Sequence, residues 1–279
     1  MADEVTERVS RYILDGSDQD LQRLLILAEL NAEAARTAFR KVGIQQGWNA
    51  IDCGCGPLGG LAVLAEMVGP VGRVVGVDFS QATVQRARAV VAALELGNVE
   101  VVAGDLHELD SAALGGPFDL AYTRLFLMHQ PDPVRTLRHI ADLLRPGGWL
   151  VAQEPLDSPP PRSHPHLEAL TDYWDLHCEL RRRAGVPAGV VENLPRSARQ
   201  AGLEVTATYG SFLVNDPALQ FEIYAATLAA ARERGIQLGI AAERIDGLVR
   251  DLQAAKGGRY EWVPSPFFLG LALRKPAAG

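Results

Sequence analysis

Short apolar runs alternate with amphipathic segments through the middle of the chain. Residues 73–78, 98–103, 118–122 and 149–153 are short and largely apolar, so each predicts a buried strand. Between these runs, apolar residues recur at helical spacing, as in Val84, Ala87 and Val91. Together with a run at residues 48–52, the pattern predicts five strands that alternate with helices. This order predicts an α/β fold with a doubly wound, mostly parallel sheet.

Helical patterns also flank the alternating region. Ser17 and Asp20 resemble a capping box, and an apolar stripe follows them to Phe39, which predicts a helical arm. This arm either forms a lid over the ligand site or simply covers the sheet. Three prolines at 159–161 end the alternating region.

Beyond the prolines, helices are predicted at 167–183 and 190–201, and a strand at 205–213. Residues 217–255 predict one or two helices, interrupted near Gly235 and Gly239, and residues 260–273 predict a final strand. We therefore expect four segments. They are an N-terminal arm (1–43), an α/β core (44–155), a helical insertion (156–202), and final strands with a second helical insertion at 217–256 (203–279). The two insertions should form a cap over the core.

A glycine-rich turn follows the first predicted strand. Residues 48–60 read Trp-Asn-Ala-Ile-Asp-Cys-Gly-Cys-Gly-Pro-Leu-Gly-Gly, and an amphipathic helix pattern begins at Leu61. Glycines between a strand and a helix let a ligand approach bare backbone at the positive end of the helix. The turn fits a dinucleotide-binding expression, with Gly54, Gly56 and Gly59 in register.

Acidic residues end or follow four of the predicted strands. They are Asp52, Asp78, Asp105 and Glu154. Parallel strands present their carboxyl ends at one edge of the sheet, where ligands bind. Asp78 stands 24 residues after Gly54, which suits a carboxylate that binds a ribose diol. Asp52 would repel a pyrophosphate but could hold an ammonium group, so an amino-acid-bearing nucleoside competes with a dinucleotide.

Composition narrows the possible partners and compartment. The net charge of −7 disfavours nucleic acid, and no apolar run is long enough to cross a membrane. Three cysteines without metal-ligand spacing indicate a reducing compartment, no disulfide framework and no metal site. The acidic N-terminus differs from a signal peptide, so we expect a cytoplasmic protein. The scarcity of lysine beside abundant arginine suggests a bacterial source. The cluster at 181–183 predicts a solvated helix face, with an anion site as the alternative.

Five short motifs carry a resemblance to a known family. They are Asp-Cys-Gly-Cys-Gly-Pro at 52–57, Val-Asp-Phe-Ser at 77–80, Ala-Gly-Asp-Leu at 103–106, Phe-Asp-Leu at 118–120 and Leu-Arg-Pro-Gly-Gly at 144–148. Their order and spacing resemble class I S-adenosylmethionine-dependent methyltransferases, in particular the ubiquinone/menaquinone-biosynthesis-like branch. The resemblance covers about residues 44–154. One departure is Leu58, where the family has a glycine.

The resemblance implies a Rossmann-like methyltransferase fold and a set of cofactor contacts. Asp78 would bind the ribose, Asp52 would lie near the amino group, and the backbone at Gly54 and Gly56 would face the methionine part. Gly104, Asp105 and Leu106 would address the adenine. Three further contacts are implied: Phe79 against a ring face, Arg124 in the floor of the site, and Tyr12 from the arm at the cofactor carboxylate.

The acceptor is less well defined than the cofactor. Glu154 and His177 are the candidate general bases, and each could instead be structural. His129 is interpreted as a residue that holds the loop after the fourth strand, with a catalytic role as the alternative. Aromatic residues of the insertions and last strands either pack in the core, as such a stripe at helical spacing often does, or form an apolar pocket for the acceptor. They are Tyr173, Trp174, Phe212, Phe221, Tyr224, Trp262, Phe267 and Phe268.

We therefore expect methyl transfer from S-adenosylmethionine, with S-adenosylhomocysteine as product, to a small or medium, largely apolar molecule. The acceptor atom could be O, C or N, and secondary or quinone-like metabolism is the expected setting. An NAD(P)-dependent oxidoreductase and a non-catalytic S-adenosylmethionine-binding protein are the alternatives. The expected partner is a small-molecule acceptor rather than a nucleic acid or a membrane, and a homodimer is left open.

Overall fold

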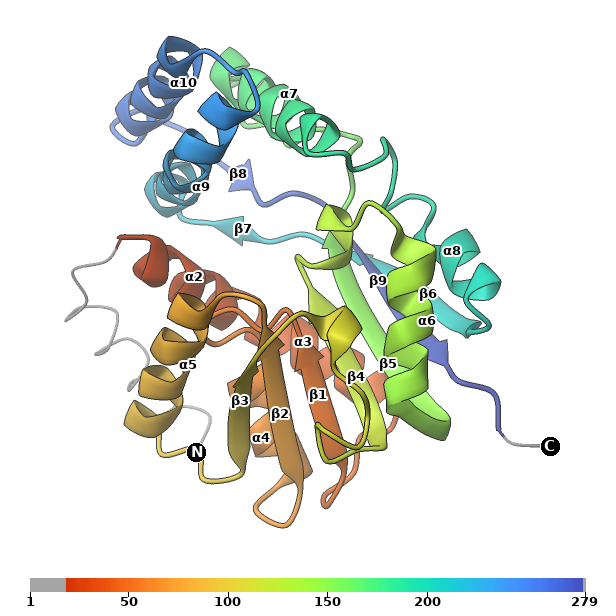
Figure 1. The fold of residues 1–279 in the computed structure, drawn as a ribbon. Helices are drawn as coiled ribbons and strands as arrows, with labels where there is room; N and C mark the ends of the chain where they lie inside the picture. Colours follow the sequence, from red (N-terminus) through yellow and green to blue (C-terminus); the bar gives the residue numbers. More distant parts are fainter. Residues whose placement is uncertain (1–18, 278–279) are drawn as a thin grey trace.

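A seven-stranded sheet forms the centre of the molecule (Figure 1). The structure is a computed structural model and describes residues 19–277. The strands are β1 (Asn49–Cys53), β2 (Arg73–Asp78), β3 (Val99–Ala103), β4 (Phe118–Arg124), β5 (Leu144–Pro155), β6 (Glu204–Ser211) and β9 (Phe268–Arg274). Their order is β3-β2-β1-β4-β5-β9-β6, and only β9 runs antiparallel to its neighbours. The order reverses between β1 and β4, which places a ligand crevice at their carboxyl ends.

Helices cover both faces of this sheet. One face carries α3 (Ala32–Lys41), α4 (Leu61–Val68) and α5 (Gln81–Ala93), and the other carries α6 (Pro133–Leu143) and α8 (Leu194–Gln200). Successive side chains of a strand point to opposite faces. Accordingly, Val74 of β2 belongs to the first apolar core, while Val75 and Val77 belong to the second. Burial on both faces explains why these strands are almost wholly apolar.

Two helices begin as the local sequence predicts. The hydroxyl of Ser80 accepts a hydrogen bond from the backbone N–H of Thr83 at 3.2 Å, which caps α5. The carboxylate of Asp132 accepts one from Arg135 N–H at 2.9 Å, and Pro133 occupies the first turn of α6. Each cap satisfies a backbone donor that has no partner inside the helix.

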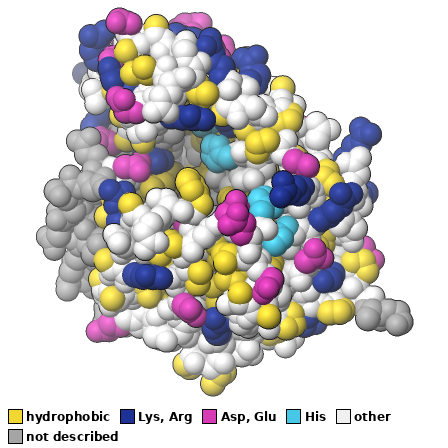
Figure 2. Space-filling model, viewed as in Figure 1, with side chains coloured by type: hydrophobic (Ala, Val, Ile, Leu, Met, Phe, Trp, Pro, Cys, Tyr) yellow, Lys and Arg dark blue, Asp and Glu magenta, His cyan; other side chains and the backbone are white. Residues whose placement is uncertain are grey.

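A helical lid lies over the carboxyl end of the sheet. It consists of α7 (Glu168–Arg183), α9 (Pro217–Gln237) and α10 (Ala242–Ala255), which share their own apolar core. A two-stranded sheet of β7 (Val214–Asn215) and β8 (Val263–Pro264) lies beneath these helices, and α2 (Gln19–Leu30) contacts α9. Figure 2 shows a hollow between the lid and the body that contains the sheet.

The predicted fold class, with an arm and two helical insertions that form a cap, is confirmed. Three details differ from the sequence prediction. Helix α9 continues through Gly235 and ends before Gly239, whose φ is +81°. A Cβ on Gly235 would lie 2.8 Å from Ile245 Cδ1, so this glycine allows α10 to pack closely rather than breaking the helix. Helix α8 begins only at Leu194, and the final strand is divided into β8 and β9. Ser17 lies outside the described residues.

Candidate functional site

The turn between β1 and α4 exposes its backbone through glycines in the left-handed region. Gly54 has a φ of +75° and Gly56 a φ of +55°. A Cβ on Gly54 would lie 2.3 Å from the Phe126 ring, whereas one on Gly56 would meet nothing within 4 Å. Gly54 is therefore required for packing, and Gly56 leaves open space beside the turn.

Asp52 lies buried beneath this turn. Its Oδ2 accepts a 2.7 Å hydrogen bond from the backbone N–H of Gly60. Gly59 stands next to the departure at Leu58, and a Cβ on it would lie 2.6 Å from the same oxygen. Burial raises the pKa of Asp52 to about 7, although the Gly60 N–H and the charge of Arg124 act in the opposite direction. Asp52 is thus a carboxyl group that a neighbouring cation would ionise.

Arg124 ends β4 beside the same turn. Its Nη2 donates to the carbonyl oxygen of Gly59 at 3.2 Å. Its Nη1 is buried and has no hydrogen-bond partner among the described residues. A buried donor without a partner is costly, so this nitrogen marks a place where an acceptor group of a ligand would be stabilising.

Asp78 connects the turn to the next strand end. Its Oδ2 accepts from the Gly56 N–H at 3.1 Å, and its Oδ1 accepts from the Ser80 N–H at 2.9 Å. Each carboxylate oxygen can accept a second bond, so the group remains able to bind a diol. Phe79, next to it, is 84% exposed and offers an uncovered ring face.

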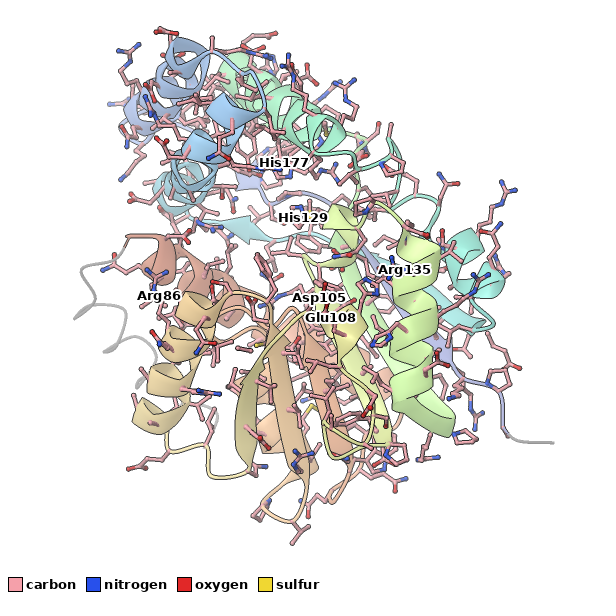
Figure 3. All side chains as sticks on the ribbon, viewed as in Figure 1. Arg86, Asp105, Glu108, His129, Arg135 and His177 are labelled. Atoms are coloured by element: carbon pink, nitrogen blue, oxygen red, sulfur yellow. The ribbon has the colours of Figure 1, made fainter. Side chains whose placement is uncertain are left out.

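The end of β3 completes this edge of the sheet. The Gly104 N–H donates to Asp78 O at 3.0 Å, which joins the two strand ends. Asp105 is exposed and caps the short helix η1 (Leu106–Glu108) by accepting from the His107 N–H at 2.9 Å. Leu106 is buried. Figure 3 shows Asp105 and Glu108 at the upper edge of the sheet, below His129.

These residues fit S-adenosylmethionine. A buried carboxyl group suits the ammonium of the methionine part, and the free nitrogen of Arg124 suits its carboxylate. Asp78 suits the ribose, and the exposed ring of Phe79 suits the adenine. Tyr12, also predicted to bind the cofactor, lies outside the described residues. No cluster of three metal-ligating side chains occurs within residues 19–277.

A cavity of about 450 Å³ adjoins this edge of the sheet. It lies between the lid helices α7 and α9, the arm helix α2 and the loop after β4. Four of the predicted aromatic residues line it: Tyr173, Trp174, Tyr224 and Phe268. Four others are not among its lining residues: Phe221, which packs in the lid core, and Phe212, Trp262 and Phe267, which are exposed. Half of the predicted aromatic residues therefore line the cavity, and the other half do not.

Glu154 holds the loop after β4 rather than facing the cavity. Its buried carboxylate accepts from the backbone N–H groups of Phe126, Leu127 and Met128 at 3.0 to 3.4 Å. Burial raises its pKa to about 7, and these N–H donors act in the opposite direction. Because the carboxylate is enclosed and occupied by the loop, the structure favours the structural alternative over a general base.

Two histidines line the cavity from opposite sides. His177 belongs to α7, and its ring stacks on Trp174 with centroids 5.2 Å apart. His129 ends the short helix η2 (Leu127–His129) and is exposed to the cleft (Figure 3). Burial, followed by the proximity of His129, lowers the pKa of His177 to about 4. Loss of surrounding water, followed by the charge of Arg181, also lowers the pKa of His129. Both rings are therefore neutral at pH 7.

Glu154 holds the loop after β4 through its carboxylate, and the role of His129 as a loop anchor stays a prediction. No hydrogen bond to the His129 ring occurs in the part of the chain that the structure describes. The sequence signal for its place in the cavity wall was its position just beyond the fourth strand, at the edge where ligands bind.

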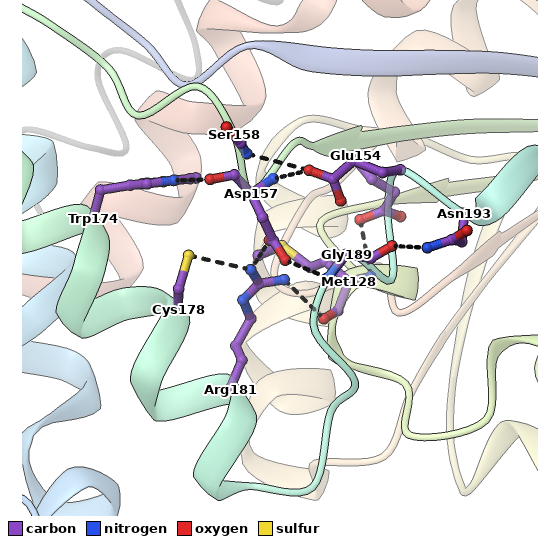
Figure 4. Close-up of polar contacts among 10 residues, drawn as sticks. Met128, Glu154, Asp157, Ser158, Trp174, Cys178, Arg181, Gly189 and Asn193 are labelled. Carbon is purple, nitrogen blue, oxygen red and sulfur yellow. Dashed lines mark hydrogen bonds and ion pairs between the residues drawn. The ribbon is translucent and has the colours of Figure 1, made fainter.

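Arg181 is buried, so the solvated-face interpretation was wrong for this residue. Its guanidinium pairs with the carboxylate of Asp157 and donates to the carbonyl oxygen of Met128 at 3.3 Å (Figure 4). Asp157 also accepts from the Gly189 N–H at 3.0 Å, and its carbonyl oxygen accepts from Trp174 Nε1 at 2.7 Å. This network fastens α7, and with it His177, to the loop that carries His129.

Comparison with known proteins assigns the chain to a family. A family model described as a methyltransferase domain matches residues 44–202. A demethylmenaquinone methyltransferase from Listeria monocytogenes is 30% identical over 47% of this chain and 55% of its own length. An uncharacterised 37.1 kDa protein of transposon TN4556 from Streptomyces fradiae is 38% identical over 57% of this chain and 44% of its own length. The match thus spans about half the length of these curated relatives.

Similarity to solved structures extends over more of the chain. The cyclopropane synthase MmaA2 from Mycobacterium tuberculosis superposes with a TM-score of 0.56 at 15% identity, over 87% of this chain and 83% of its own. At this identity, the likeness concerns the fold alone.

Proposed function

Because the chain belongs to the class I S-adenosylmethionine-dependent methyltransferase family, we propose that it methylates a small or medium, largely apolar molecule in the cavity beneath the lid. The observation that carries this proposal is the position of the cavity, which lies beside the loop after β4 and the end of β5, at the carboxyl end of the sheet, and is lined mainly by aliphatic and aromatic side chains. Its volume of about 450 Å³ suits a small molecule. Secondary or quinone-like metabolism is the setting that we propose.

The cofactor supplies an electrophilic methyl group on a sulfonium sulfur, which keeps the electron pair of the broken bond. The chain's own contribution is then mainly positioning. Asp52, Asp78 and Arg124 would hold the cofactor at the carboxyl edge of the sheet. The leucines of α2 and the aliphatic side chains of α9 that line the cavity would hold the acceptor and exclude water.

We assign the general base to His177. Its ring lines the cavity, is neutral at pH 7 and is held by Trp174. A proton from an acceptor hydroxyl or acidic carbon would pass to a ring nitrogen of His177 as the new bond to the methyl group forms. His129 faces the same cavity and would receive or orient the same proton.

The proposal is tested by product formation. Purified protein with S-adenosylmethionine should release S-adenosylhomocysteine when members of a panel of apolar phenols, enols and quinols are added. No release with any acceptor class while the cofactor binds tightly would support a non-catalytic binding protein instead, and release without a methylated acceptor would show transfer of the methyl group to water and contradict the proposed acceptor.

Calorimetry separates the methyltransferase from the oxidoreductase alternative. We expect binding of S-adenosylhomocysteine and no binding of NADPH, because the carboxylate of Asp52, buried beneath the glycine turn, would repel a pyrophosphate bound at that turn. Tighter binding of NADPH than of S-adenosylhomocysteine would contradict the proposal.

A further inference from the structure

The charges that line the acceptor cavity all have one sign. Among the described residues of its wall are three arginines, Arg23, Arg181 and Arg234, and neither an aspartate nor a glutamate. The remaining titratable groups in the wall are His129, His177, Tyr173 and Tyr224, which are all neutral at pH 7. A cavity with this lining attracts an anion and repels a cation.

The counter-charges of two arginines are not among the lining residues. Arg23 pairs with Asp20 at 2.7 Å, and Arg181 pairs with Asp157, but neither carboxylate lines the cavity. Arg234 is exposed, and within residues 19–277 its guanidinium contacts the neutral amide of Gln237 at 3.3 Å. The lining therefore includes three arginines but not the acidic partners of Arg23 and Arg181.

The aromatic rings of the cavity do not provide a cation site in place of carboxylates. An ammonium ion can bind over the face of a tryptophan or tyrosine ring. In this cavity, Trp174 stacks with His177, and Tyr173 packs against both His177 and Tyr224, with centroids 6.1 and 4.6 Å apart. These contacts compete with a cation for the ring faces.

We propose that the acceptor is an apolar molecule that carries a negatively charged oxygen, as in a carboxylate or an acidic phenol or enol, and that it is not an amine. This inference rests on the proposed function and names the acceptor class for the same cavity. Arg23, whose side chain is 14% exposed, and Arg234 are the residues that attract the charge.

Three probes of one shape and different charge test the inference. They are para-butylbenzoate, para-butylbenzyl alcohol and para-butylbenzylamine, titrated into the protein saturated with S-adenosylhomocysteine and followed by calorimetry at low salt. We expect the benzoate to bind about tenfold or more tightly than the amine, with the alcohol between them, and the difference to shrink at high salt. Equal affinities, tighter binding of the amine, or no binding of any probe would overturn the inference.

Charge variants show which arginines produce the preference for an anionic probe. Arg23→Gln and Arg234→Gln should each weaken benzoate binding about threefold to tenfold and leave the alcohol unchanged, whereas Arg23→Lys should keep most of the preference. Arg40→Gln, on the exposed face of α3 and paired with Glu33, is the matched control and should change nothing. Because the probes are not turned over, the result is independent of methyl transfer. Failure of S-adenosylhomocysteine to bind would instead refute the proposed function.

Discussion

The carboxylate of Glu154 accepts a 3.0 Å hydrogen bond from the backbone N–H of Leu127, which fixes the end of β5 to the loop that carries His129. Two neighbouring N–H groups share the same carboxylate. This relationship separates two roles for Glu154 that the sequence alone left open, and it determines the outcome of a substitution.

Glu154→Ala should lower the free energy of unfolding by about 2–4 kcal/mol, because it leaves buried N–H donors without an acceptor. Glu154→Gln keeps one acceptor oxygen for these N–H groups, so it should still hold the loop in part. This variant should therefore retain more than about a tenth of the methylation rate. Thermal unfolding and S-adenosylhomocysteine release measure the two effects. A loss of about 10²–10⁴-fold in a stable Glu154→Gln protein would restore Glu154 as the general base.

His177→Phe should keep the stacking on Trp174 and lose the proton acceptor. We expect kcat to fall by about 10²–10⁴-fold and S-adenosylhomocysteine affinity to remain within about twofold of the parent. His166→Gln, at an exposed position near the start of α7, is the control. An unchanged kcat for the Phe variant would remove His177 from the mechanism.

Asp78→Ala should weaken cofactor binding by about 1–3 kcal/mol through loss of charged hydrogen bonds to the ribose. Calorimetry with S-adenosylhomocysteine measures this change. Because Asp78 also accepts from the N–H groups of Gly56 and Ser80, circular dichroism should accompany the titration to show that the turn remains folded. Unchanged affinity would refute the ribose assignment.

Cofactor affinity should depend on pH through Asp52. Burial raises its pKa to about 7, and an ammonium group favours the ionised carboxylate. Below pH 7, cofactor binding must therefore release the proton from the Asp52 carboxyl group. Cofactor affinity should weaken by up to about tenfold for each unit of pH below 7 and should level off above pH 7. Titrations between about pH 5.5 and about pH 8 test this. Asp52→Asn should bind weakly and without this slope; the same slope in that variant would assign it to another group.

Local patterns were sufficient to predict the sheet and its ligand edge. The strands β1 to β4 are short and largely apolar runs. Asp52 and Asp78 lie at the ends of β1 and β2, and Asp105 follows β3, so they meet at one edge because parallel strands end there. Their roles as cofactor contacts remain predictions, although their positions agree with them. The glycine turn was readable for the same reason, since its conformation depends on residues close in sequence.

The cavity was not predictable at this level because its wall is assembled from distant segments. Arg23 and Thr227 contact each other at 3.5 Å across 204 residues. Arg181 stands in a run of three arginines that is indistinguishable from an exposed helix face until Asp157 and Met128 are placed against it. Gly235 likewise reads as a helix breaker, and only the approach of Ile245 shows its packing role.

Arg181 and Asp157 should be energetically coupled. Removing one partner of a buried ion pair leaves the other charge uncompensated, so Arg181→Met should destabilise the protein by about 3–5 kcal/mol. Asp157→Asn removes the opposite charge, and the double variant should be less destabilised than the sum of the single changes. Denaturant unfolding of the four proteins gives the coupling energy. If the pair also positions His177, stable single variants should lose kcat while S-adenosylhomocysteine affinity is kept. Additive destabilisation with normal kcat would show instead that α7 is held by its apolar core alone.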